Sequence, residues 1–320
     1  MPGFALVFPG QGSQYVGMGR DLYAASPAAR AVFDEADQAW GGPLSQLMFE
    51  GPAETLTDTV NAQPALFVMS MACWAALGEA LAGLQVQPAF VAGHSLGEYT
   101  ALAAAGAFTF QTGFQLVRER GLAMKAAGEA RPGGMAAILG LDAETVAALC
   151  REASAQTGEP VAVANDNAPG QIVISGAHEA VRTASDLAKA HGAKRVVPLA
   201  VSVAPHSPLM EPAAARFAPF LRQADLRSPR LPVVGNRQAR PLTTVDEILD
   251  ELTEQLTSQV RWTESIRYIE AQGISTFIEV GPKDVLTGLV KRIAPTATCI
   301  PCGSVSGVDQ AAQLLRRLLS

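Results

Sequence analysis

Charged side chains are scarce in this 320-residue sequence, where Asp, Glu, Lys and Arg together make up 17%. The Lys and Arg residues are scattered and the formal net charge is −6, so no basic surface for nucleic acid is expected. Hydrophobic residues account for 48% of the chain, which is enough to form a sizeable core. The length predicts one large domain or two closely joined ones.

Targeting and membrane signals are also missing. The first residues, Met1 to Phe4, show no basic segment followed by a long apolar stretch. We find no run of about 18 uncharged apolar residues of the kind that spans a membrane. We therefore expect a cytoplasmic protein without membrane contact.

Cysteine is rare, and its spacing excludes the usual metal sites. The four residues are Cys73, Cys150, Cys299 and Cys302, and the last two form a Cys-Ile-Pro-Cys pair. A zinc site needs four ligands and there is no second pair, while a redox pair is expected to open a helix near the start of the chain. We expect four free thiols and no metal site.

A short apolar run ends in the pattern Gly-His-Ser-Leu-Gly at residues 93–97. Residues 88–92 are typical of a strand and residues 99–105 of a helix, which is the context of a nucleophile elbow. Such a turn exposes the hydroxyl of Ser95, and the start of the helix directs free N–H groups toward a developing oxyanion. This context favours a nucleophile over an ordinary glycine-serine turn.

Histidine is also scarce, which narrows the search for a general base. His94 lies inside the elbow, His178 opens a predicted helix, and His191 stands at a helix end before a glycine. His206 follows a strand-like stretch and remains the candidate base for Ser95.

A third, acidic member of a catalytic triad is not evident in the sequence. Three carboxylates are candidates, and each has an ordinary capping or ion-pair role as its alternative: Asp246, Asp250 and Glu279.

Arg120 falls on the apolar stripe of a helix predicted from Phe110 to about Ala127, between Val117 and Met124. An arginine that faces a core needs an anionic partner, because an isolated buried charge costs several kcal/mol. The partner is either a structural carboxylate or a carboxylate of the substrate. Periodicity does not distinguish these two.

A glycine-rich loop, residues 9–14, follows the apolar run from Phe4 to Phe8. It does not match the dinucleotide-binding pattern, because Tyr15 stands where a glycine is needed, nor the phosphate loop, because Met18 stands in place of the lysine. A loop whose backbone approaches the substrate closely remains the interpretation.

Helices alternate with short apolar strands, which predicts an α/β fold with a mainly parallel sheet. A helix capped by Ser26 is expected from Pro27 to about Trp40, and a long buried one from Pro64 to Leu84.

Residues 131–199 change to the order βαββαβ, which is typical of a ferredoxin-like unit. Its strands are predicted at 135–139, 161–164, 171–175 and 195–200, its helices at 143–153 and 178–190, and a turn at 165–170. We expect a large subdomain of residues 1–130 and 200–320, with this small subdomain, residues 131–199, inserted.

The sequence resembles the malonyl-CoA:acyl carrier protein transacylase family. The segments that carry the resemblance occur in order along the whole chain: residues 8–14, 93–99, 119–121, 168–176, His206, 235–236, 254–256, 262–265 and 279–282. The resemblance implies an α/β-hydrolase-like large subdomain and a ferredoxin-like small one. It also implies transfer of malonyl from coenzyme A to the phosphopantetheine thiol of the carrier protein, without a cofactor, for type II fatty-acid synthesis.

The resemblance also implies roles for single residues. Ser95 is the nucleophile and His206 the base. The backbone carbonyl of Gln255 orients His206, which accounts for the missing acid. The remaining roles are an oxyanion hole from the N–H groups of Gln11 and Leu96, a malonate anchor at Arg120, and substrate contacts by Gln11, His94 and Asn165.

The partner implied by the resemblance is an acidic acyl carrier protein that docks transiently on a monomer, at the cleft between the subdomains. Because this chain is itself acidic, a local basic patch is needed, for which the candidates are Arg182, Lys189, Lys194, Arg195, Lys283 and Arg292.

Alternatives remain open. A serine hydrolase or thioesterase would use the same serine and histidine. A polyketide synthase acyltransferase or the transacylase subunit of malonate decarboxylase would use the same transfer chemistry, and a docking module would use none. Pro205, directly before the base, stiffens the approach to His206. The resemblance implies that related polyketide acyltransferases read the acyl group at this place. The choice of acyl group is therefore the property that the resemblance implies least directly.

Overall fold

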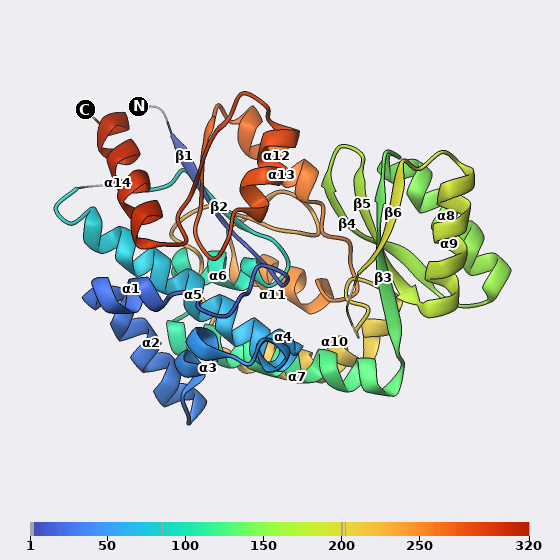
Figure 1. Ribbon diagram of the computed structural model, residues 1–320, viewed down its shortest axis with the longest axis horizontal. Coiled ribbons are helices and arrows are strands. Elements are labelled where there is room, and N and C mark those ends of the chain that lie inside the picture. Colours follow the sequence, from blue (N-terminus) through green and yellow to red (C-terminus); the bar gives the residue numbers. More distant parts are fainter. Residues whose placement is uncertain (1–2, 85, 200, 202, 320) are drawn as a thin grey trace.

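A six-stranded sheet forms the centre of the computed structural model, which describes residues 3–84, 86–199, 201 and 203–319 (Figure 1). The strand order is β10-β9-β1-β2-β7-β8, and every pairing is parallel except that of β7 with β8. The mainly parallel sheet is thus confirmed. Its strands are β1 (Phe4–Phe8), β2 (Phe90–Gly93), β7 (Val233–Val234), β8 (Pro241–Leu242), β9 (Thr276–Glu279) and β10 (Thr298–Pro301).

The central strand β1 is buried on both faces, as its unbroken apolar sequence predicts. Phe4, Leu6 and Phe8 pack into the core on one side of the sheet, whereas Ala5 and Val7 pack into the core on the other side. Helices cover both sides. They are α1 (Arg20–Ala25), α2 (Pro27–Trp40), α3 (Leu44–Glu50), α4 (Ala53–Thr57), α5 (Thr59–Ala80), α6 (Gly97–Ala104), α7 (Phe110–Ala130), α10 (Glu211–Gln223), α11 (Val245–Glu254), α12 (Trp262–Ala271), α13 (Val285–Ile293) and α14 (Val305–Leu319), with a 3-10 turn at Pro208–Met210.

The long helix α5 begins at Thr59, five residues before the predicted start at Pro64. Asp58 caps it by accepting a hydrogen bond from the N–H of Val60. By length and hydropathy alone α5 passes as a membrane span, although polar residues such as Asn61 and Gln63 interrupt its apolar sequence. However, 72% of its apolar window is buried inside the protein, as in a core helix.

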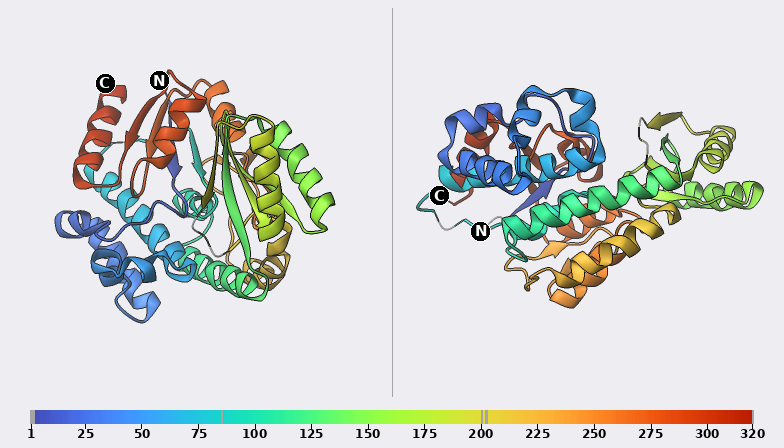
Figure 2. Two further views of the ribbon diagram at one scale, coloured as in Figure 1. Left: turned by 45° about the vertical axis from the view of Figure 1, so that its right-hand side comes forward. Right: turned by 90° about the horizontal axis from the view of Figure 1, so that it is seen from below.

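A separate four-stranded antiparallel sheet has the order β4-β5-β3-β6 (Figure 2). It is built from β3 (Gly133–Leu139), α8 (Ala143–Thr157), β4 (Val161–Ala168), β5 (Gln171–Ala177), α9 (His178–Ala190) and β6 (Arg195–Leu199). This is the predicted βαββαβ order, with α8 and α9 packed on one face. Ala200, the predicted last residue of β6, lies outside the described residues, and the boundaries of the two subdomains stay a prediction.

The turn predicted at residues 165–170 is confirmed only at Pro169 and Gly170, because β4 continues to Ala168. The physical reason is that this stretch forms backbone hydrogen bonds with Val260, in the segment before α12. The N–H of Asp166 donates to the Val260 carbonyl at 3.0 Å, and the N–H of Val260 donates to the Ala164 carbonyl at 2.8 Å. Together with the pairing of residues 165–168 with β5, these bonds keep the Asn-Asp-Asn stretch extended, and they join the small sheet to the segment before α12.

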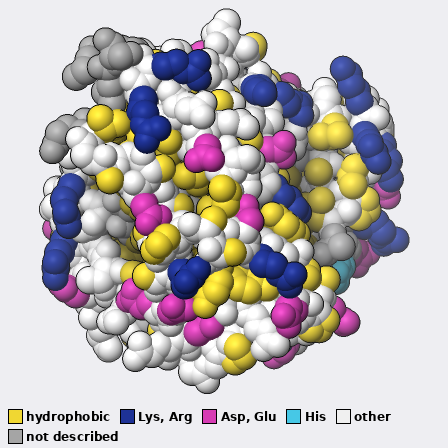
Figure 3. Space-filling model, turned by 60° about the vertical axis from the view of Figure 1, so that its left-hand side comes forward, with side chains coloured by type: hydrophobic (Ala, Val, Ile, Leu, Met, Phe, Trp, Pro, Cys, Tyr) yellow, Lys and Arg dark blue, Asp and Glu magenta, His cyan; other side chains and the backbone are white. Residues whose placement is uncertain are grey.

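The four cysteines are free thiols, as predicted. In the face shown in Figure 3, Lys and Arg side chains are dispersed rather than gathered into one patch.

The turn between β2 and α6 packs closely against β1, which leads to a prediction. A Cβ at Gly97 would lie 2.0 Å from the carbonyl oxygen of Phe8. We expect Gly97→Ala to lower the free energy of unfolding by about 1–3 kcal/mol or more, because backbone atoms cannot give way. Gly78→Ala in α5, where nothing lies within 4 Å, is the control and is expected to stabilise by about 0.5–1 kcal/mol. Urea unfolding measures both, and equal stability of Gly97→Ala and wild type would contradict the close packing.

Candidate active site

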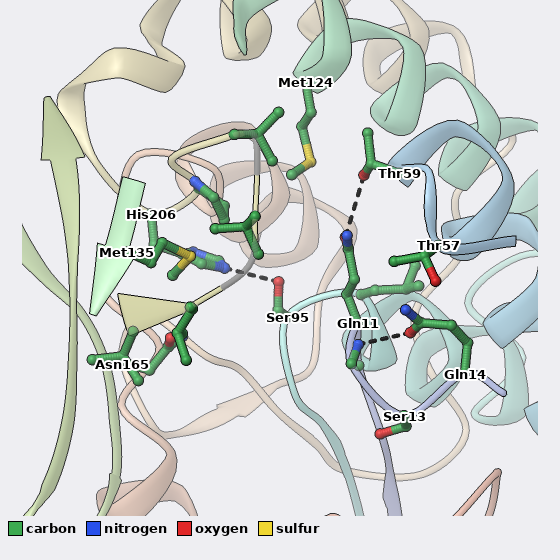
Figure 4. Close-up of a pocket in the computed structure, with 18 of the residues that line it drawn as sticks. Gln11, Ser13, Gln14, Thr57, Thr59, Ser95, Met124, Met135, Asn165 and His206 are labelled. Atoms are coloured by element: carbon green, nitrogen blue, oxygen red, sulfur yellow. Dashed lines mark hydrogen bonds between the residues drawn. The ribbon is translucent and has the colours of Figure 1, made fainter. Parts of the chain in front are cut away.

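A cavity of about 1330 Å³ lies between the elbow and the inner face of the small sheet. It is lined by the loop after β1, the elbow, one end of α7, and side chains from β3, β5 and α13 (Figure 4). Its walls combine polar groups with apolar ones, the latter including Met124, Met135, Val173, Val201 and Leu286.

Ser95 is half-buried and has the strained backbone conformation that the elbow pattern predicts. Its φ is +51°, a region that residues other than glycine rarely occupy. It stands between the end of β2 and the start of α6, and its Oγ lies 2.8 Å from His206 Nε2.

His206 is fixed by backbone carbonyls. Its Nδ1 lies 2.9 Å from the carbonyl oxygen of Gln255 and 3.0 Å from that of Ser258. With the proton on Nδ1 donated to these oxygens, Nε2 is the acceptor that faces the Ser95 hydroxyl. The Gln255 contact agrees with the resemblance, whereas Ser258 was not anticipated.

The three acidic candidates for a triad do not contact His206. Asp246 is exposed at the start of α11, and Asp250 pairs with Arg237. Glu279 accepts hydrogen bonds from the first N–H groups of α13, those of Leu286 and Thr287. Each therefore has the ordinary role that was its alternative.

The environment keeps His206 uncharged. Burial lowers its pKa to about 3, and the nearby Arg120 and His94 act in the same direction. A neutral imidazole at pH 7 can accept the proton of Ser95, so burial leaves His206 in the protonation state that a general base requires.

Two backbone N–H groups are available for an oxyanion hole. Among the described residues, neither the N–H of Gln11 nor that of Leu96 has an acceptor. A Cβ at Gly10 would lie 2.4 Å from the carbonyl oxygen of His94, so the glycine-rich loop packs closely against the elbow. In Figure 4 Ser95 lies between His206 and Gln11.

Arg120 is 1% exposed, and among the described residues no carboxylate pairs with it. Its Nη1 donates to Gln63 Oε1 at 2.7 Å. Its Nη2 donates to Gln255 Oε1 at 2.9 Å and to Ser95 Oγ at 3.1 Å. The guanidinium also lies 5.4 Å from the centre of the Tyr99 ring. The structural ion pair considered as one alternative is therefore wrong, and a cation held by neutral amides reaches the nucleophile.

His94 and Asn165 line the same cavity, as the resemblance implies. The Nε2 of His94 lies 2.7 Å from Asn167 Oδ1, so His94 faces the small sheet and not Ser95.

Sequence reasoning did not assign a role to two polar residues of α5. The hydroxyl of Thr59 donates to Gln11 Oε1 at 3.2 Å, and it accepts a hydrogen bond from Gln63 Nε2 at 2.9 Å. Together they connect the loop after β1 with Arg120. A buried amide in an otherwise apolar helix is the signal that marks Gln63.

Comparison with known proteins places the chain among acyltransferases. The acyl transferase domain family matches residues 5–308. A malonyl CoA-acyl carrier protein transacylase of Bacillus subtilis strain 168 is 46% identical over 99% of this chain and 98% of that protein.

Solved structures agree. The malonyl CoA-acyl carrier protein transacylase of Coxiella burnetii matches with a TM-score of 0.94 and 40% identity over 98% of both chains. A malonyl-transacylase solved with a type II polyketide acyl-carrier protein matches with a TM-score of 0.92 and 41% identity, over 98% of this chain and 99% of that one. The chain therefore belongs to the acyl transferase family, and its resemblance to the malonyl-CoA:acyl carrier protein transacylases is confirmed.

Proposed function

We propose that this protein transfers the malonyl group of malonyl-CoA to the phosphopantetheine thiol of an acyl carrier protein, through an ester on Ser95. The observation that carries the proposal is the buried Arg120, whose Nη2 lies 3.1 Å from Ser95 Oγ and which has no carboxylate partner among the described residues. An acyl group that ends in a carboxylate pairs with this guanidinium while its thioester carbon meets the nucleophile.

Acylation follows from the geometry. His206 Nε2 takes the proton of Ser95 as Oγ attacks the thioester carbon, and the N–H groups of Gln11 and Leu96 stabilise the oxyanion. The intermediate collapses by breaking the carbon–sulfur bond, and the leaving thiolate of coenzyme A takes the proton from the imidazolium. This proposal assigns every step to protein groups and requires no cofactor.

The second half-reaction reverses these roles. His206 takes the proton of the carrier thiol, the sulfur attacks the malonyl ester, and Ser95 leaves with the proton returned by the imidazolium. A hydrolase would use water at this step. The similarity to transacylases over the full length of the chain supports a thiol as the acceptor.

For the pathway, we propose supply of malonyl groups to type II fatty-acid synthesis by a cytoplasmic monomer. Polyketide synthesis is the second candidate, because a malonyl-transacylase solved with a polyketide carrier protein is as similar to this chain as the Coxiella enzyme.

For carrier docking, we propose the two basic residues next to the cavity. Lys283 donates to the Gly12 carbonyl at 3.1 Å, and Arg292 donates to the Pro169 carbonyl at 3.2 Å. Lys283 precedes α13 and Arg292 lies in its last turn, and this helix contributes to the cavity wall. Arg182 and Lys189 lie on α9, across the small sheet from the cavity, and both are engaged in ion pairs on that helix.

The covalent intermediate is directly testable. Incubation with malonyl-CoA is expected to add one malonyl group to the wild type, and addition of carrier protein to move it to the carrier's thiol. Ser95→Ala removes the nucleophile, so no adduct is expected. Intact-mass spectrometry measures both, and full malonylation of the variant would contradict the assignment of Ser95.

The low pKa of His206 predicts the pH dependence of acylation. Because the pKa of about 3 keeps the imidazole neutral, kcat/KM for malonyl-CoA is expected to stay level from pH 8 down to pH of about 5. An unperturbed histidine would lose activity through its ordinary pKa of about 6.5. Arg120→Ala removes one cause of the lowered pKa, so its acidic limb is expected at higher pH. A wild-type limb near 6.5 would show that burial does not hold the base neutral.

The carboxylate anchor predicts substrate preference. Arg120→Ala is expected to reduce malonyl transfer by about 2–5 kcal/mol in transition-state terms, the range for truncating one side of a buried charge pair, while acetyl transfer holds or improves. Lysine at this position is expected to rescue in part, because an ammonium lacks two parallel donors. Arg118→Ala is the control, because Arg118 lies on the same helix over the Trp40 ring. The measurement is the ratio of malonyl to acetyl kcat/KM in wild type and variants. An equal decline of kcat/KM for both substrates in Arg120→Ala would contradict the role of Arg120 as a carboxylate anchor.

A further inference from the structure

We infer that Glu98 is a positioning residue of this site: through Asn236 and Gln255 it holds the strained Ser95 peptide and turns the Gln255 amide toward Arg120. The inference rests on the proposed function, because it is read out as a preference for malonyl over acetyl. Glu98 is fully buried in the first turn of α6, and the catalytic steps derived above do not use it.

The first connection runs through Asn236, which is 1% exposed and follows β7. Its Oδ1 accepts from the N–H of Ser95 at 2.7 Å, and its Nδ2 donates to the Gly93 carbonyl at 2.6 Å. One amide therefore bridges both sides of the turn and stabilises the unusual φ of Ser95. The backbone N–H of Asn236 in turn donates to Glu98 Oε1 at 2.9 Å.

The second connection runs through Gln255, which is also 1% exposed. Its Nε2 donates both to the Ser95 carbonyl at 3.0 Å and to Glu98 Oε2. Its Oε1 accepts from Arg120 Nη2 at 2.9 Å. Because Glu98 offers acceptors, the NH₂ group of Gln255 must face it, and the carbonyl oxygen must face Arg120. The carboxylate thus sets the orientation of the amide that holds the guanidinium.

Hydrogen bonding supports the same arrangement. Among the described residues Glu98 forms no ion pair, and Arg120 is linked to it through the single amide of Gln255. Burial and the nearby Glu251 hold the pKa of Glu98 well above its usual range, although the bonds from Gln255 and Asn236 and the charge of Arg120 oppose this shift. Both carboxyl oxygens accept N–H groups, and these two bonds fix the orientation of the neighbouring groups.

Glu98→Gln tests the inference without changing the size of the side chain. The N–H of Asn236 cannot reorient, so the oxygen of the new amide stays with it and its NH₂ group faces Gln255. Gln255 must then rotate and present its own NH₂ group to Arg120. We expect the ratio of malonyl to acetyl kcat/KM to fall at least about tenfold, because two buried donors then face each other.

Glu279→Gln is the matched control. Glu279 is a carboxylate of equal size and is 0% exposed. Its two oxygens accept from the N–H groups of Leu286 and Thr287 at 2.9 and 2.6 Å, and among the described residues it makes no hydrogen bond to the elbow, Asn236 or Gln255. Its variant is expected to lose thermal stability comparably while keeping the malonyl to acetyl ratio. If Glu98 contributed to stability alone, both variants would lose thermal stability and keep the malonyl to acetyl ratio of the wild type.

A double-mutant cycle identifies the route of the effect. Gln255→Met removes the amide, and is itself expected to lower the ratio. In that background Glu98→Gln is expected to change the ratio no further, because the group it reorients is gone.

Three results would overturn the inference: an unchanged ratio in Glu98→Gln, a parallel loss for both substrates, or additive effects in the cycle. If Glu98→Gln does not fold, Gln255→Met alone decides, and an unchanged ratio there overturns the inference as well. Absence of malonylation in the wild type would instead contradict the proposed function.

Discussion

The uncompensated positive charge of Arg120 is the constraint on which the site depends. A guanidinium that is 1% exposed and unpaired with any described carboxylate is costly to bury, and neutral amides from Gln63 and Gln255 meet part of that cost. The same charge helps to keep His206 neutral, so that it can act as a base. The amides of Gln63 and Gln255 thus stabilise a buried positive charge that can bind an anionic acyl group and that helps to keep the base neutral.

This arrangement requires segments that are far apart in the sequence. Gln63 on α5 lies 57 residues from Arg120, and Gln255 lies 135 residues from it. The large sheet brings the segments of the site together. Because β1 and β2 are adjacent and parallel, the glycine-rich loop and the elbow follow the carboxyl ends of both strands at the same edge of the sheet. The small sheet closes the cavity from the other side, held by its backbone pairing with Val260. The site therefore lies where the two sheets meet.

Predictions from local pattern were mostly accurate. The capped helices at Pro27 and Phe110, the parallel sheet and the βαββαβ order all agree with the structure, because each depends on neighbouring residues. One prediction failed where tertiary contacts override local preference: residues 165–168 are extended because they pair with β5 and with Val260. The start of α5 was placed five residues too late although its signal is local, because the capping residue Asp58 stands directly before Thr59.

From sequence alone, Ser95 was predictable as the nucleophile, because the elbow is a local turn whose glycines allow close packing against β1, and the candidate base was one of only four histidines. The tertiary structure decided what those groups contact. A backbone carbonyl that orients His206 leaves no pattern in the residues themselves, so only the resemblance implied Gln255, and none of the three candidate carboxylates contacts the histidine. Whether Arg120 meets a protein carboxylate likewise depended on long-range packing, because helical periodicity gives the direction of a side chain but not its partner.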